Sequence, residues 1–297
     1  MESFFMDDQQ TNSLYKAEDI LKQLQTVTTL PPIPRVLQEI SQLFNSQTIS
    51  AKKVTTLIEK DPSLTLKVLS VANSPLYGLR RNVTNISTAV IMLGMREIKS
   101  IVTSIRMAAT MKMKSDKYFN PDKFLNHSMI VGILTQRMAK DLGFNFEGDG
   151  FTAGMLHDMG ILIIHEYLSN EFLQIAGYSV QNKTTFLESE YKVLGLSHQE
   201  IGEFLTDKWQ LPSVLSDALQ YHHRPGNSKE NNFLTAILHL ADYAVSKFES
   251  AGTIWDENYR VDNSIIELLN FLSPEGVDEF IEAYKVDYLE ASKALII

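Results

Sequence analysis

Apolar residues recur at intervals of three and four along most of this chain, and this periodicity constrains the fold more than any other feature. Between residues 61 and 72, for example, Leu64, Val68, Val71 and Ala72 belong to the apolar stripe of one helix. No segment shows the sustained alternation of apolar and polar residues, bounded by hairpin turns, that predicts strands. The sequence therefore predicts an all-α protein.

Prolines, glycines and capping residues mark the helix boundaries. Asp61-Pro62 predicts a helix start, because proline at the first helical position loses no hydrogen bond. Leu93-Gly94-Met95 divides residues 85–112 into two helices, and Leu30–Pro34 is too rich in proline to lie inside one. The other predicted helices span residues 15–24, 36–44, 50–58, 124–142, 151–168, 186–195, 197–208, 212–222, 232–247, 262–272 and 275–293.

Composition and charge exclude several kinds of site and partner. The chain has no cysteine, so disulfides, thiolate metal sites and cysteine nucleophiles are excluded. Its formal net charge of −9 makes nucleic acid an unexpected partner, because that binding needs a basic face to displace counterions from phosphates. No run of 18 apolar residues and no secretory signal occurs, so we expect a cytoplasmic protein without a membrane partner.

The histidines are confined to one part of the chain. All seven lie between His127 and His239, and acidic residues lie near several of them, as in His157-Asp158. Imidazole and carboxylate are natural ligands of Zn, Mn, Fe, Ni or Mg, so a divalent metal is the candidate cofactor. The candidate ligands are His127, His157, Asp158, His198, His222, His223 and Asp242.

Metal binding requires these residues to meet on separate helices of a bundle. Neighbouring side chains point about 100° apart around a helix, so His157 and Asp158 can share an ion only if the helix presents that edge obliquely. His165 and His239 lie outside the pattern, and we interpret them as packed, hydrogen-bonded core residues. The alternative for the whole set is a structural remnant whose histidines are hydrogen-bonded and bind no ion.

Several motifs resemble known families. Met155–Gly160 resembles the signature of the HD superfamily of metal-dependent phosphohydrolases. The chain also resembles HDOD proteins over about residues 20–225, in the motifs Leu30–Pro34, Asp61–Leu64, Asn73–Gly78, Ala89–Gly94 and His198–Gly202. The resemblance implies an N-terminal helical bundle packed on an HD-like bundle. It also implies a role in bacterial signalling or regulation.

The resemblance further implies a domain division and a set of ligands. Residues 1–20 would be a flexible N-terminal segment, residues 21–225 an HDOD domain with subdomains 21–115 and 116–225, and residues 226–297 the C-terminal helices that complete the HD-like bundle. By position, a single-metal HD site would comprise His127, His157, Asp158 and Asp242. A second metal would add His198 and His222, with His223 beside them.

Two departures from active relatives bear on catalysis. The related cyclic-di-GMP phosphodiesterases often have a lysine where this chain has Ile161, and they follow the His-His pair with a glutamate and then Gly-Tyr-Pro, where this chain has Arg224. Hydrolysis of cyclic-di-GMP is therefore not expected. We predict a regulatory protein that binds a signalling protein partner or a small phosphorylated ligand. The alternative is a metal-dependent phosphohydrolase acting on a nucleotide or phosphodiester, with Asp158 as catalytic residue. The sequence predicts no oligomeric state.

Overall fold

The computed structural model describes residues 8–26, 51–79, 81–109, 113–146, 148–249, 255 and 259–294, and every regular element in these ranges is helical. The all-α prediction is thereby confirmed. The elements are α1 (Asp8–Thr26), α3 (Ala51–Glu59), α4 (Pro62–Ala72), η1 (Pro75–Tyr77), α5 (Ile86–Leu93), α6 (Met95–Ala108), α7 (Pro121–Asp141), α8 (Asp149–Leu156), α9 (Met159–Tyr167), α10 (Ser169–Asn182), α11 (Phe186–Leu194), α12 (His198–Lys208), α13 (Ser213–Tyr221), η2 (Pro225–Asn227), α14 (Asn232–Phe248), α15 (Ser264–Leu268), α16 (Pro274–Glu282) and α17 (Lys285–Ala294).

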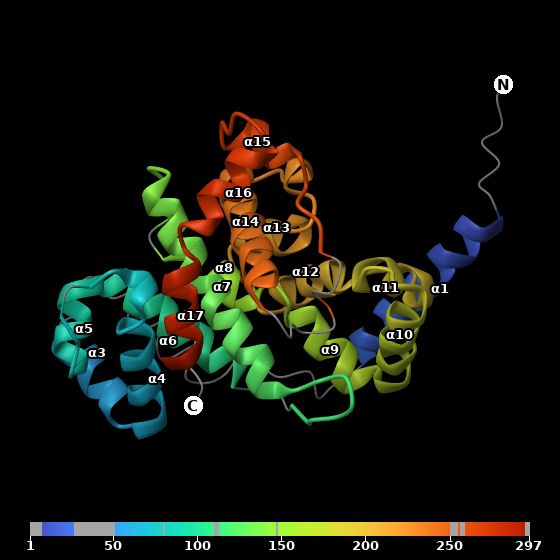
Figure 1. Ribbon diagram of the computed structural model, residues 1–297. Helices are drawn as coiled ribbons and strands as arrows, with labels where there is room; N and C mark the ends of the chain where they lie inside the picture. Colours follow the sequence, from blue (N-terminus) through green and yellow to red (C-terminus); the bar gives the residue numbers. More distant parts are fainter. Residues whose placement is uncertain are drawn as a thin grey trace.

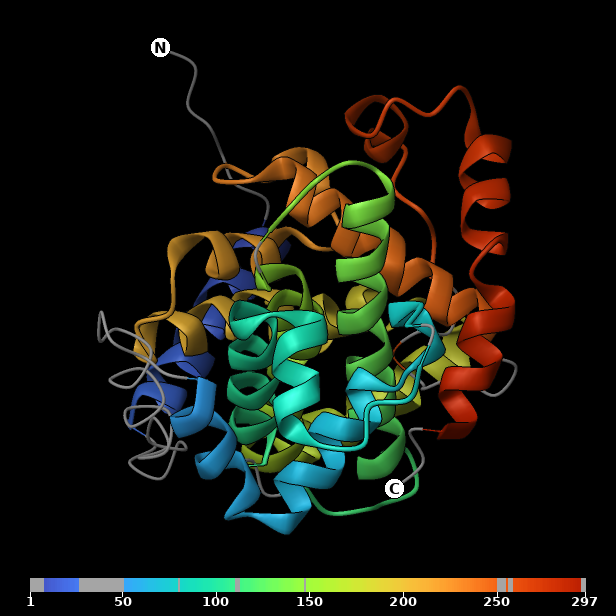
Figure 2. The ribbon, with the colours of Figure 1, turned by 90° about the vertical axis from the view of Figure 1, so that its left-hand side faces the viewer.

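The helices form a central group with a smaller group at each end. Helices α3, α4, α5 and α6 gather at one end, α7 and α8 lie centrally, and α1, α10 and α11 lie at the other end (Figure 1). The C-terminal helix α17 returns to pack on η1 and α7, as the two ribbon views show (Figure 2). One apolar core joins α3–α6 to α7, α8 and α14, and a second core lies around α9–α12. Within the described residues, no helix combines the length and apolar character needed to cross a bilayer.

Several predicted helix boundaries are confirmed. The side chain of Asp61 caps α4, and Pro62 occupies the first position of that helix. Gly94, with φ of 86°, separates α5 from α6 where the sequence predicts a break. The helix predicted over residues 36–44 and the motif Leu30–Pro34 lie outside the described residues.

Other predictions of local structure were wrong. The helix predicted over residues 151–168 is two helices, α8 and α9, which separate at His157 and Asp158. The segment predicted as one helix over residues 275–293 is likewise divided into α16 and α17. Helix α1 begins at Asp8, earlier than the predicted helix start at residue 15. Helix α10 is absent from the predicted set, although its buried residues have helical spacing: Phe172, Ile175, Ala176 and Ser179.

Helices α7 and α8 approach so closely that only glycine fits at their contact. A Cβ atom on Gly154 would lie 2.5 Å from the Cα atom of Gly132, which is closer than real Cβ contacts. Gly154 precedes His157 by less than one helical turn, and His127 lies on α7 shortly before Gly132. The glycine contact therefore determines how closely these two histidine-bearing segments lie.

We expect Gly154→Ala to lower the free energy of unfolding by about 1–3 kcal/mol, because the added methyl group must push α7 and α8 apart. Gly177→Ala on α10 is the matched control, since nothing lies within 4 Å of its added Cβ. This control should be stabilising by roughly 0.5–1 kcal/mol, as expected for glycine replaced by alanine in a helix. Chemical denaturation measures both. Equal effects of the two substitutions would contradict the close contact.

A buried carboxyl group in the N-terminal helices should make stability depend on pH. Glu97 on α6 accepts a hydrogen bond of 2.6 Å from the hydroxyl of Tyr77, and burial raises the pKa of Glu97 from 4.5 to about 7. The folded state therefore binds this proton more tightly than the unfolded chain does. The resulting stability is fully present below the unfolded pKa and is lost as pH rises through about 7.

Between pH 4.5 and about 7, we expect the free energy of unfolding to fall by an amount on the order of 3 kcal/mol. This part of the fall is due to Glu97. Glu97→Gln has no proton to lose, so its profile should be flatter by this amount. Denaturant unfolding at several pH values measures the difference between the two proteins. Parallel profiles for the wild type and the variant would refute the assignment.

Candidate metal centre

His157 and Asp158 lie at the break between α8 and α9, and the break lets both side chains reach one place. His157 ends α8, and Asp158 has φ of −96° and ψ of 11°, in the bridge region outside regular helix. His157 Nε2 lies 3.1 Å from Asp158 Oδ2. Because one helix ends and another begins here, His157 and Asp158 can both face the same point, as a shared metal ion would require.

His127 on α7 and Asp242 on α14 complete a first group with this pair, which we call the HD group: His127, His157, Asp158 and Asp242. Asp242 Oδ1 lies 3.3 Å from His127 Nε2 and 3.5 Å from His157 Nε2, and His127 Nε2 lies 3.9 Å from Asp158 Oδ2. Two ligands of one ion are separated by roughly 3.0–3.4 Å when each lies about 2.0–2.1 Å from the metal. The HD group is close to that spacing.

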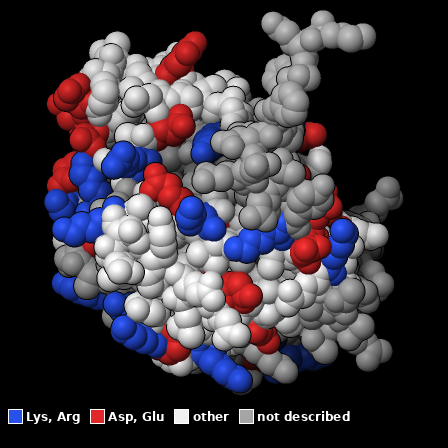
Figure 3. Space-filling model, turned by 90° about the vertical axis from the view of Figure 1, so that its right-hand side faces the viewer, with Lys and Arg blue, Asp and Glu red and all other residues white. Residues whose placement is uncertain are grey.

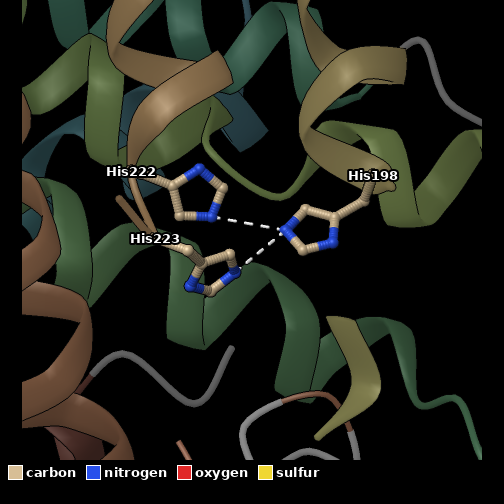
Figure 4. Close-up of side chains that lie close together, drawn as sticks. All are labelled: His198, His222 and His223. Carbon is tan, nitrogen blue, oxygen red and sulfur yellow. Dashed lines mark hydrogen bonds between the residues drawn. The ribbon is translucent and has the colours of Figure 1, made fainter. Parts of the chain in front are cut away.

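A second group, which we call the triple-histidine group, consists of His198, His222 and His223. His198 begins α12, and the other two follow α13. His198 Nε2 lies 3.3 Å from His222 Nε2 and 3.2 Å from His223 Nε2, with all three rings turned toward a common point (Figure 4). The other oxygen of Asp158, Oδ1, lies 3.5 Å from His198 Nε2 and 3.8 Å from His222 Nε2. Asp158 thus faces both groups, one with each carboxylate oxygen.

Hydrogen bonds at the outer ring nitrogens leave the inner nitrogens free to act as ligands. His157 Nδ1 lies 2.7 Å from the carbonyl oxygen of Gly154, and His222 Nδ1 lies 2.7 Å from that of Leu219. A carbonyl oxygen can only accept, so each Nδ1 carries a hydrogen. In the neutral ring the lone pair is then on Nε2, which points into the cluster. This is the arrangement of metal-ligating histidines.

The burial of the cluster tests whether a cation fits. Six of the seven candidate ligands are almost fully buried, and His223 is half-buried. Among the described residues, His157 Nε2, Asp158 Oδ2 and Asp242 Oδ1 are buried with no hydrogen bond of acceptable geometry. Buried polar atoms without partners are costly, and a divalent cation would satisfy all three. The donor set and its spacing therefore fit a bound metal ion.

A model of the HDOD domain family matches residues 30–225. The chain belongs to the HDOD family. An uncharacterised protein of Treponema pallidum is 20% identical over 205 residues, covering 69% of this chain and 39% of that protein. Ribonuclease Y of Lactobacillus acidophilus is 32% identical over 135 residues, or 46% of this chain and 19% of that enzyme. The chain therefore spans less than half the length of either curated relative.

Solved structures share the fold over nearly the whole chain. An HDOD domain protein of unknown function from Geobacter sulfurreducens matches with a TM-score of 0.75 and 25% identity, covering 96% of this chain and 97% of that one. A protein of Shewanella amazonensis, provisionally assigned as a phosphohydrolase, matches with a TM-score of 0.69 and 25% identity, covering 92% and 97%. These likenesses agree with the HDOD assignment.

One residue of the HDOD site was missed by the sequence reasoning. Glu190 on α11 is fully buried, and its Oε2 atom lies 2.7 Å from His198 Nδ1. The sequence did contain a signal, because Phe186, Glu190 and Leu194 are spaced by four residues and share one face of the helix. An acidic residue at a predicted core position needs a partner, and here the partner is a candidate ligand.

The protonation states of most of the cluster suit a metal, although neighbouring carboxylates outweigh burial and raise the pKa values of His157 and His198. Burial alone would raise the pKa values of both carboxyl groups, but the imidazole of His157 lowers the pKa of Asp158 to about 2 and that of Asp242 well below its ordinary value. Burial lowers the pKa values of His222 and His223 well below the ordinary range. Ionised carboxylates and neutral imidazoles are the forms that bind metal.

The two histidines set aside in the sequence analysis have other partners. His239 Nδ1 donates to the carbonyl oxygen of His222 at 2.7 Å, and His239 Nε2 accepts the backbone N–H of Asp262 at 2.8 Å. His165 Nε2 lies 2.9 Å from Asp116 Oδ2, and its ring stacks on Phe119. Both are hydrogen-bonded core residues, as predicted. His239 also fixes the backbone of a candidate ligand.

A separate cavity of about 580 Å³ lies on another side of α7. It is bounded by Ile105 of α6, Met129 of α7, Met155 of α8 and Tyr288 of α17, so it joins the N-terminal helices to the central group. None of the seven candidate ligands lines it. Its volume lies within the range of small-molecule sites, but the His/Asp cluster lies elsewhere.

We expect Mn²⁺ to raise the thermal midpoint of this HDOD protein, and a chelator to reverse the effect, because an ion that binds only the folded state stabilises it. The stabilisation is about 2.7 kcal/mol when the free metal is at 100 times its Kd. Asp158→Ala removes the carboxylate that faces both groups and should abolish most of the response. His165→Ala, a histidine outside the cluster, should retain it. Calorimetric scans of the three proteins test the site, and an unchanged response in Asp158→Ala would refute it.

Proposed function

We propose that this chain is a bacterial regulatory HDOD protein that holds two divalent metal ions and uses them to bind the phosphoryl group of a small phosphorylated ligand. The observation that carries the proposal is the position of Asp158, whose two oxygens face the HD group and the triple-histidine group. A carboxylate placed in this way can bridge two ions. Membership of the HDOD family supports the regulatory role.

The exposed edge of the cluster, at His223 and Arg224, is where a phosphoryl group would approach. The ions would supply attraction for phosphoryl oxygens and would lower the pKa of bound water. His223 is the most exposed of the candidate ligands, and the exposed Arg224 follows it directly. A guanidinium group binds phosphate oxygens in a bidentate manner, so Arg224 is suited to hold the ligand at this edge.

The residue that follows the motif His157–Gly160 favours binding over turnover. Ile161 is fully buried and apolar, so it supplies no positive charge for a phosphoryl group. A nucleic-acid ligand is also disfavoured. Basic and acidic side chains are interspersed on the face around α10 and α11, and the described residues there form no continuous basic groove (Figure 3). A signalling protein partner and a cytoplasmic location stay predictions.

The alternative is a metal-dependent phosphohydrolase. It is supported by the position of Asp158, whose two oxygens could hold two ions, and by relatives that include a ribonuclease and a provisionally assigned phosphohydrolase. In that case Asp158 would hold both ions beside the scissile phosphate. Release of p-nitrophenol from bis(p-nitrophenyl) phosphate by metal-loaded protein, lost in Asp158→Ala, would establish this alternative in place of simple binding.

Binding of inorganic phosphate tests the proposal directly. We expect Mn²⁺-loaded protein to bind phosphate, seen as broadening of its ³¹P NMR signal, and metal-free protein to bind much more weakly. Arg224→Ala should weaken binding several-fold, because it removes a charge-assisted hydrogen bond to the phosphate. Arg81→Ala, another exposed arginine, located among the N-terminal helices, is the matched control and should have no effect. Phosphate affinity that is the same with and without metal would contradict the proposed function.

A further inference from the structure

Glu190 differs from the groups that support the other candidate ligands. Its Oε2 atom accepts two hydrogen bonds from His198, one from Nδ1 at 2.7 Å and one from the backbone N–H at 3.1 Å. The supporting partners of His157 and His222 are neutral carbonyl oxygens. A carboxylate polarises the ring more strongly than a carbonyl does, and so makes Nε2 of His198 a better metal ligand.

The charges of the two groups explain why the triple-histidine group needs this carboxylate. The HD group contains two carboxylates, Asp158 and Asp242, which offset one divalent ion. The triple-histidine group contains three imidazoles, and Asp158 is the carboxylate of the HD group that lies within 4 Å of them. Asp242 approaches His222 less closely, with their ligand atoms within 4.8 Å. A second divalent ion would thus be placed in a buried site with too little negative charge, and desolvated charges require compensation. Glu190 is fully buried in contact with this group and provides that charge.

The fold fixes Glu190 and His198 relative to each other. His198 occupies the first position of α12, where the backbone N–H groups have no partner inside the helix, and Glu190 accepts one of them. The positive end of the helix dipole also favours a carboxylate at this place. On the other side, a Cβ atom on Gly160 would lie 2.0 Å from the carbonyl oxygen of His198, so α9 packs directly against the same residue. The imidazole of His198 therefore has little freedom to move.

We propose that Glu190 is a positioning residue that enables the triple-histidine group to hold its ion, and that it thereby decides whether the protein binds one metal ion or two. The inference rests on the proposed function, because it assumes that metal binds at both groups. Glu190 acts through His198 and by its charge, and it is not itself a ligand.

The test is Mn²⁺ binding by the whole 297-residue chain. Equilibrium dialysis and metal analysis give the number of ions per chain. Electron paramagnetic resonance detects coupling between paired ions. We expect two ions and a coupled spectrum for the wild type. Glu190→Gln should weaken the second ion by about 10–100-fold, the usual effect of removing an outer partner of a ligand, and should leave the spectrum of a single ion. Glu190→Asp keeps the charge but shortens the reach, so its second-ion affinity should be intermediate.

The matched control is Glu97→Gln, which also replaces a buried glutamate with its amide, but in α6 and beside Tyr77. It should keep both ions. Binding of the first ion shows that each variant is folded, because Glu190 makes its hydrogen bonds to His198 and none to the HD group. If Glu190→Gln bound two ions with wild-type affinity, the inference would be overturned. Loss of both ions from this variant would also overturn it, because that result would indicate a general structural role for Glu190. A wild type that binds fewer than two ions would instead contradict the proposed function.

Discussion

The burial of two carboxylates at one point is the constraint on which the rest of this structure depends. Asp158 and Asp242 are only 3% and 1% exposed, so their negative charges are removed from water and must be balanced by cations nearby. Although burial alone would lower the pKa of His157, the two carboxylates raise it well above its ordinary value. Without metal, a proton on His157 therefore supplies part of the balance. A divalent ion would displace that proton, which makes metal binding and proton release parts of one equilibrium.

The backbone reaches this arrangement by interrupting helices. A continuous helix would direct His157 and Asp158 about 100° apart, and the break between α8 and α9 removes that restriction. The flanking contacts are possible only because of small residues. Gly154 lets α8 lie against α7, and Gly160 lets α9 lie against the start of α12. The backbone segments that carry the candidate ligands of these four helices are therefore positioned by close backbone contacts.

The sequence was sufficient to predict the helical class and the set of candidate ligands. These candidates could be singled out because histidine and aspartate are chemically unusual on helices that otherwise bury apolar residues. Their mutual arrangement could not be predicted, because it depends on long-range contacts such as that between Gly132 and Gly154, where each glycine alone resembles any helical glycine. The position of Asp158 between the two groups is of the same kind. It follows from a helix break that apolar periodicity conceals, since the apolar pattern continues from α8 into α9.

The same packing connects the His/Asp cluster to the N-terminal helices α3–α6. Met155 precedes His157 by two residues and belongs to the apolar core that also contains Ile105 of α6. Ser100 of α6 hydrogen-bonds with Thr152, one helical turn earlier on α8. A close-packed interior transmits small displacements because it has few voids to absorb them. A shift of His157 on ion binding would therefore reach α6 through α8, because the two helices share this core and this hydrogen bond.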